Sequence, residues 1–214
     1  MRRGLWFRAV SAGKFKERVV VSAIVAAVGA GPLVIGLSLR PSPGEYRDFE
    51  GAIERVRPHA GGATQFEVLT AAALAEFRER SVDVAVVEAG LGGRHDATNV
   101  IDARVVLLTN VSLEHTDVLG DTREAIAREK LAVAKPGATV VLGEPEWATL
   151  LAGRDVRFGG AREAAEAFVG RPVEADVEVT LPGRLEWRGP DEVWDGAHNA
   201  AGLDWLVAHL PERN

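Results

Sequence analysis

Three residues of this 214-residue chain have side chains that could do chemistry together: Glu88, His115 and Lys130. A carboxylate and an imidazole suit a divalent metal ion held near phosphates. A single Glu or His is usually structural, and Lys130 alone would be a surface lysine on a helix. Glu88, however, follows four apolar residues, where an unpaired buried carboxylate would be costly. The group is therefore a candidate metal site.

Glycines gather directly after Glu88, in the stretch AGLGGRHDATN (residues 89–99). Glycine lets backbone and a bound group approach each other closely. The alternative is a tight strand-to-helix turn without a ligand. Both interpretations place a sharp backbone turn beside the candidate carboxylate.

Alternating strands and helices must position these residues. Hydrophobic periodicity predicts a helix over FEVLTAAALAEFRER and buried strands in SVDVAVVEAG, ARVVLLTNV and ATVVLG. A second helix is predicted over GDTREAIAREKLAVAKPG, opened by Asp121 and Glu124 in capping-box spacing. Continuously hydrophobic strands that alternate with helices are typical of a parallel α/β sheet, which binds ligands at the carboxyl ends of its strands.

The pattern weakens after about Gly143. The segment that follows contains a plausible helix and little strand. LPGRLEW and DEVWDGAHNAAGLDWLVAHL then predict a strand, a polar turn and an amphipathic helix. We expect this lone β-α unit to leave its apolar face uncovered, because it has no sheet to join.

Composition narrows the class of protein. A net charge of −6 argues against a nucleic-acid partner, since phosphate contacts need a clustered basic surface. The sequence has no cysteine, so disulfides and thiolate metal sites are excluded, and a cytoplasmic location is the default.

One uncharged segment, residues 19–39, could instead be a signal peptide or membrane span. Gly29, Gly31, Pro32 and Gly36 interrupt it. We therefore expect a short helix beginning at Ser22, a Gly-Pro turn and a strand, without a membrane partner.

Four blocks carry a family resemblance: FEVLTAAALAEF, VVEAGLGGRHDATN, LTNVSLEHTDVLGDTREAIAREK and WDGAHN. Together they resemble the folylpolyglutamate synthase/dihydrofolate synthase family of the Mur ligase superfamily. The resemblance implies an α/β, parallel-sheet P-loop-type ATPase domain followed by the start of a second α/β domain. It implies a monomeric, ADP-forming ligase that uses ATP and Mg²⁺. The reaction would join L-glutamate to dihydropteroate or reduced folate through an acyl phosphate.

The resemblance also assigns roles to residues. Glu88 and His115 match magnesium ligands, and Lys130 matches the lysine that is carbamylated, so Lys130 and His115 form the catalytic pair. The other assignments are as follows: Phe66, Glu67, Val68, Leu69 and His95 for the pterin substrate, and Arg184 and Asp195, with His198 in support, for ATP. Without the family, Arg184 would be a surface arginine and Asp195 a helix N-cap.

Two loops depart from the family pattern. In VSAGKFKERV, Gly13-Lys14 are kept, so Lys14 is the candidate phosphate-loop lysine, but Phe15 and Lys16 replace glycine and serine. A bulky Phe would block the close approach that glycine allows. LRPSPGEY resembles the family's metal loop only faintly, which makes Ser42 a further metal-ligand candidate.

The domain expected after the phosphate-binding part is also short. We expect an ATP-binding domain over residues 1–145 and a linker with a truncated ligase domain over 146–214. The chain is then a truncated or degenerate copy, and we expect no measurable glutamate addition by it. Two alternatives stay open: an inactive remnant that only binds a pterin or folate, and another Mur-type amino-acid ligase.

Overall fold

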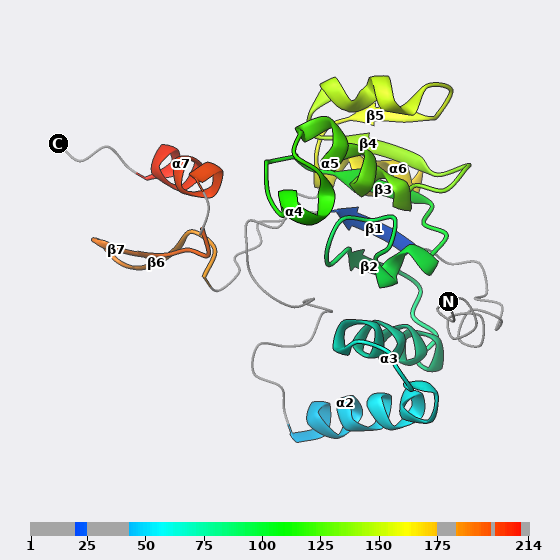
Figure 1. Ribbon diagram of the computed structural model, residues 1–214. Helices are drawn as coiled ribbons and strands as arrows, with labels where there is room; N and C mark the ends of the chain where they lie inside the picture. The colour runs from blue at the N-terminus through cyan, green and yellow to red at the C-terminus, as the bar shows by residue number, and fades with distance from the viewer. Residues whose placement is uncertain (1–19, 25–42, 175–182, 198–199, 211–214) are drawn as a thin grey trace.

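The computed structural model describes residues 20–24, 43–174, 183–197 and 200–210. Within them, five strands form one parallel sheet in the order β2-β1-β3-β4-β5, which confirms the predicted α/β class (Figure 1). Two further strands, β6 and β7, form an antiparallel hairpin. The strands are β1 (Val20–Ile24), β2 (Ala85–Glu88), β3 (Val105–Leu108), β4 (Thr139–Leu142), β5 (Val156–Phe158), β6 (Glu186–Gly189) and β7 (Glu192–Trp194).

Helices and 3-10 turns connect these strands. The α-helices are α2 (Pro43–Val56), α3 (Gln65–Glu79), α4 (Thr116–Leu119), α5 (Arg123–Lys130), α6 (Ala161–Val169) and α7 (Ala200–His209). The 3-10 turns are η1 (Arg57–His59), η2 (Ala97–Val100), η3 (Leu131–Val133) and η4 (Pro145–Leu151). Helices α2 and α3 lie side by side and bury a small alanine-rich cluster between them (Figure 1).

Local signals set the starts of α3 and α5. Helix α3 begins with a capping box, in which Thr64 Oγ1 accepts from the Glu67 amide and Glu67 accepts from the Thr64 amide at 2.7 Å. Helix α5 is capped by Thr122, whose Oγ1 accepts from the Ala125 amide at 3.1 Å. The prediction of Asp121 as the cap was therefore wrong by one residue, because the hydroxyl of Thr122 satisfies the free amide instead.

Strands β3 and β4 are buried on both faces of the sheet, with alternate side chains pointing to opposite faces. One face packs on α5, η3 and η4, and its residues are Val106, Leu108, Val140, Leu142, Ile126, Leu131 and Trp147. The other face packs on α6, and its residues are Val105, Leu107, Val141, Ala164 and Phe168. Burial on both faces explains why β3 and β4 are continuously hydrophobic rather than alternating.

Strand β1 lies at the point where the chain reverses its order across the sheet, since β2 pairs on one side of it and β3 on the other. Ala23 of β1 lies opposite Glu88, and Ile24 lies opposite Leu108. The carboxyl ends of the three strands are thus level. Open α/β sheets bind ligands at such a switch point.

Three details differ from the sequence predictions. The helix expected from Ser22 is instead strand β1 as far as Ile24, because this apolar run fills the centre of a parallel sheet; residues 25–42 lie outside the described part. Strand β5 pairs with β4 and α6 packs on β3, so the sheet continues past the expected boundary at residue 145. The expected polar turn includes a second strand, β7.

The region after β5 and α6 ends in the hairpin and α7, drawn apart from the sheet in Figure 1. Helix α7 exposes Leu203, Trp205 and Val207, as expected for a unit without a sheet of its own. Among the described helices, none has the length and apolar character needed to cross a membrane.

Candidate active site

Glu88 ends β2 at the switch point. Its side chain is half-buried, and loss of water raises the pKa of the carboxyl above its usual value, because burial disfavours the charged form. The positive charges of Arg184 and Lys130 act in the opposite direction and lower the pKa in part. Within the described residues the carboxylate accepts no hydrogen bond, so it is available to a cation.

Lys130 is the last residue of α5 and is buried, with 5% of its surface exposed. Its Nζ lies 3.4 Å from Oε1 of Glu114, and both side chains are largely shielded from water. The alternative of a surface lysine is therefore wrong. Glu114, which carried no role in the sequence analysis, is its charge partner.

His115 immediately precedes α4. Its backbone has φ 50° and ψ 39°, the left-handed region, which is uncommon for a residue other than glycine. Its carbonyl accepts from the amides of Val118 and Leu119, each at 2.9 Å. Its ring is exposed, and no hydrogen bond to the ring occurs in the described part of the chain. A nitrogen of this ring is thus open to a ligand.

These observations link the three candidate residues. Lys130 acts electrostatically on Glu88 and pairs with Glu114, the neighbour of His115. Among the described residues, no cluster of three or more Asp, Glu or His side chains could hold an ion alone. An ion held here would therefore need ligands besides described side chains, such as water or phosphate oxygens, which Mg²⁺ commonly uses.

The glycines after Glu88 each meet a close neighbour. A Cβ at Gly90 would lie 2.5 Å from Cζ of Phe66, and one at Gly93 would lie 2.5 Å from the Lys130 carbonyl oxygen. Gly92 has φ +67°. The glycines therefore let the loop pass between the ring of Phe66 on one side and the end of α5 on the other.

Asp96 organises this loop and was missed by the sequence analysis. Its Oδ2 accepts from the amides of Gly90 (2.9 Å) and Leu91 (3.0 Å). Its Oδ1 accepts from the amide (2.9 Å) and the hydroxyl (2.5 Å) of Thr98. The signal was present, because Asp-x-Thr before a short helix is an N-cap pattern.

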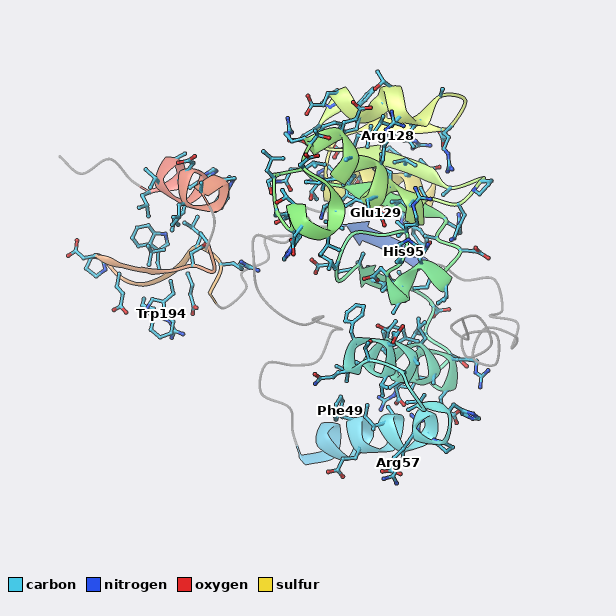
Figure 2. The ribbon with its side chains drawn as sticks, viewed as in Figure 1. Phe49, Arg57, His95, Arg128, Glu129 and Trp194 are labelled. Carbon is cyan, nitrogen blue, oxygen red and sulfur yellow. The ribbon has the colours of Figure 1, made fainter. Side chains whose placement is uncertain are left out.

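Arg94 ties the same loop to α5. Its amide donates to Oε1 of Glu129 at 3.2 Å, and its Nε lies 3.1 Å from Oε2. Figure 2 shows Glu129 on α5 and His95 on the neighbouring loop. His95 is exposed there, adjacent to the loop anchor. The glycine loop and the helix that ends in Lys130 are thus held together.

The four residues expected in the substrate pocket separate by role. Phe66 covers Gly90, Glu67 closes the capping box, and Val68 packs in the cluster between α2 and α3. Leu69 is half-buried. The ring of Phe66 lies directly against the glycine loop at Gly90.

The C-terminal candidates lie in the hairpin unit. Asp195 accepts from the amide of Leu185 at 2.8 Å and from that of Ala197 at 2.7 Å, so it holds the two ends of the hairpin together. Arg184 is exposed, packs against Gly196, and acts on Glu88 through its charge. The hairpin therefore carries a cation toward the switch point.

Three candidates, Lys14, Ser42 and His198, lie outside the described residues. Lys14 precedes β1 in the chain.

Comparison with protein families matches residues 51–160 to the Mur ligase middle domain. A probable bifunctional folylpolyglutamate synthase/dihydropteroate synthase of Halobacterium salinarum is 41% identical over 163 residues, which are 73% of this chain and 18% of that protein. The dihydrofolate synthase/folylpolyglutamate synthase of Escherichia coli is 42% identical over 117 residues, 55% of this chain and 26% of that protein. The aligned segments thus span about a quarter or less of these relatives.

Solved structures share the fold. E. coli FolC in complex with DHPP and ADP has a TM-score of 0.77 at 22% identity, over 98% of this chain and 70% of that chain. The folylpolyglutamate synthase/dihydrofolate synthase of Yersinia pestis complexed with AMPPNP and Mn ion has a TM-score of 0.72 at 21% identity, over 96% of this chain and 69% of that chain.

Proposed function

The chain belongs to the folylpolyglutamate synthase/dihydrofolate synthase family and carries its Mur ligase middle domain. We propose that it functions as an ATP-dependent ligase of folate metabolism. The reaction joins the amino group of L-glutamate to a carboxylate of dihydropteroate or a reduced folate. ATP first phosphorylates that carboxylate, glutamate then attacks the acyl phosphate, and ADP and phosphate leave.

The observation that supports this proposal most strongly is the environment of Glu88. Its half-buried carboxylate has lost part of its water and accepts no hydrogen bond from described residues, and burial raises its pKa, so an additional cation would stabilise the ionised form. Its position level with the carboxyl ends of β1 and β3 is where the ligand of such a sheet binds. A structural carboxylate would be expected to accept hydrogen bonds there.

The donor set fits a hard divalent cation. Glu88 would supply a carboxylate oxygen and His115 a ring nitrogen. When bound with ATP, the ion offsets negative charge on the transferring phosphoryl group. Mn ion is present in the Yersinia pestis relative, and we propose Mg²⁺ as the ion used here.

Cationic residues complete the nucleotide side. Arg184 already acts on Glu88, so its guanidinium could approach an anionic phosphate at the same edge. Lys130 is the buried amine that we propose is carbamylated, as the family resemblance implies. In the unmodified chain its charge is balanced by Glu114.

The substrate side rests on Phe66 and the glycine loop. E. coli FolC is described with DHPP bound, and the chain shares its fold. We propose that the ring of Phe66 and the exposed His95 contact the pterin, while Asp96 keeps the loop in its folded shape. We further propose a cytoplasmic monomer, which size-exclusion chromatography would check.

The test measures ADP release with Mg²⁺, dihydropteroate and L-glutamate, compared with a Glu88→Ala variant. Turnover that is lost in Glu88→Ala supports the ligase. Phe15 and Lys16, in place of the glycine and serine of the phosphate loop, favour a second candidate, a chain that binds a pterin but does not turn over. Binding of dihydropteroate in calorimetry without ADP release would support that second candidate. If neither binding nor ADP release is seen, both candidate functions are contradicted.

A further inference from the structure

Arg123, in the first turn of α5, reaches four partners on two other segments. Its Nε donates to the carbonyl of Val111 at 2.9 Å, and its Nη2 donates to Oε1 of Glu144 at 2.8 Å. Its Nη1 lies 2.8 Å from Oε1 of Glu146, and its guanidinium lies 5.0 Å from the ring centre of Trp147. No role in the proposed chemistry accounts for this arginine.

Glu144 completes the same arrangement from the turn after β4. Its Oε2 accepts from the Val111 amide at 2.9 Å and from Nε1 of Trp147 at 2.7 Å. The amide and the carbonyl of Val111 are therefore both held, one by Glu144 and the other by Arg123. Val111 itself is 3% exposed, so neither group could be satisfied equally well by water.

The segment held in this way runs from the end of β3 to His115. Val111 lies four residues before His115, whose backbone is in the left-handed region. At the other end of the segment, the amide of Gly143 donates to the Leu108 carbonyl at 2.8 Å. A Cβ at Gly143 would collide with the Thr109 carbonyl. The segment is thus fixed where it leaves the strand and again at Val111.

An ordinary surface ion pair would not explain this geometry. The pair Arg128–Glu124 on the same helix joins neighbouring turns and is exposed on both sides, with 59% and 60% of the side chains accessible. Arg123 and Glu144 are 41% and 29% accessible and join segments 21 residues apart. The planar fork of arginine suits simultaneous bonds to a carbonyl and a carboxylate.

We propose that Arg123 and Glu144 are positioning residues that fix the segment Thr109–His115, and through it the place of His115 at the candidate metal site. The inference rests on the proposed function in that His115 is taken as a metal ligand. Neither residue is among the proposed metal, nucleotide or substrate contacts. They act through the backbone of Val111, as outer-shell partners act on metal ligands elsewhere.

The first experiment needs no ligand. Hydrogen exchange of the amides of residues 110–115 is measured by mass spectrometry in the wild-type chain, Arg123→Gln and Arg128→Gln. We expect exchange at least about tenfold faster in Arg123→Gln, because a charge-assisted anchor is lost, and no change in Arg128→Gln. Equal exchange in all three chains would contradict the proposal that Arg123 fixes the segment Thr109–His115.

The second experiment measures Mn²⁺ affinity, by electron paramagnetic resonance, in the same chains. Arg123→Gln should bind Mn²⁺ about tenfold more weakly, the low end of the effect of losing a direct outer-shell partner, because Arg123 acts through the Val111 backbone. Ile126→Val, a core change on the same helix, supplies a destabilised control that should bind normally. Weakening in Ile126→Val equal to that in Arg123→Gln would overturn the positioning role.

Two further arms keep the outcomes separate. If the wild-type chain binds no Mn²⁺, the proposed function fails. The exchange data still test whether Arg123 fixes the segment Thr109–His115. If Arg123→Gln does not fold, Glu144→Gln replaces it, since a neutral amide still occupies the space. Faster exchange in Glu144→Gln at residues 110–115 is then the expected result, and unchanged exchange would overturn the proposal.

Discussion

The ring of Phe66 lies so close to Gly90 that a Cβ at position 90 would come within 2.5 Å of Cζ. This contact joins the first turn of α3 to the loop that begins two residues after Glu88. It brings the proposed pterin-binding side chain and the proposed metal ligand to the same short stretch of backbone. Changes at Gly90 should therefore be felt on the substrate side before the fold as a whole is lost.

The first prediction concerns Gly90→Ala. The new methyl group displaces the Phe66 ring, and we expect dihydropteroate affinity to fall by about tenfold or more, as overpacking at a close contact usually costs 1–3 kcal/mol. Isothermal titration calorimetry measures this. Gly61→Ala is the matched control, because its Cβ would meet nothing within 4 Å. Unchanged affinity in Gly90→Ala would show that Phe66 does not line the pocket.

The second prediction concerns Gly93→Ala. Here the obstacles are the backbone carbonyl oxygens of Lys130 and Glu129, at 2.5 and 2.6 Å from the added Cβ, and backbone cannot rotate away. We expect the free energy of unfolding to fall by about 1–3 kcal/mol. Urea denaturation measures it against Gly61→Ala. A midpoint equal to that of the control would contradict the close packing of this loop on α5.

The third prediction concerns Asp96→Asn. One side-chain oxygen is replaced by a donor, so either the Gly90 and Leu91 amides or Thr98 lose their acceptor. We expect a loss of about 1–3 kcal/mol in the free energy of unfolding, because bonds to a charged carboxylate are lost or weakened at several donors at once.

Its control is Asp155→Asn, at a site where one side-chain bond, from Thr139 at 2.6 Å, is affected. We expect a smaller loss there, together with normal amide exchange in residues 90–98. Equal losses at the two positions would mean that Asp96 does not organise the loop.

The sheet and the main helices were predictable because their signals are local. The runs in β3 and β4 are continuously apolar since both faces are covered, and α3 shows helical spacing behind a capping box. The three candidate residues were proposed from their places after strands and from the family motifs, and their roles stay predictions. Burial of Lys130 was not predictable, because it depends on the loops that surround the end of α5.

Other features depend on contacts distant in sequence. Strand β1 is central because it pairs with β2 and β3, as in the pairs Val20–Ala85 and Val21–Val105, which are far apart in sequence. Its apolar run alone did not distinguish a strand from a helix. The bonds of Arg123 and Glu144 to Val111 likewise join three segments. Spacing within one segment carries no sign of such a junction.

The fourth prediction concerns pH. Burial raises the pKa of the Glu88 carboxyl above its ordinary value of 4.5, so the folded chain holds this proton more tightly than the unfolded chain does. The contribution of Glu88 to stability is then full below pH 4.5 and is lost as pH rises through the folded-state pKa. In metal-free buffer, the free energy of unfolding of Glu88→Gln should therefore fall less than that of the wild type as the pH rises above 4.5.

Thermal unfolding across pH 4 to 8 with a chelator measures this difference. Addition of Mn²⁺ should reverse it, because the ion stabilises the ionised carboxylate of the wild type and Glu88→Gln offers no such ligand. Parallel pH curves for the two chains, with and without Mn²⁺, would contradict the desolvated carboxylate.

The most direct test of the central claim is the position of the metal ion. Crystals grown with Mn²⁺ and AMPPCP would locate it by anomalous scattering, and a magnesium form would give the ligand distances. We predict one ion bound to both Glu88 and His115, at about 2.0–2.1 Å for magnesium, with phosphate oxygens among the other ligands. An ion bound elsewhere, or Glu88 and His115 too far apart for one ion to bridge, would contradict the account.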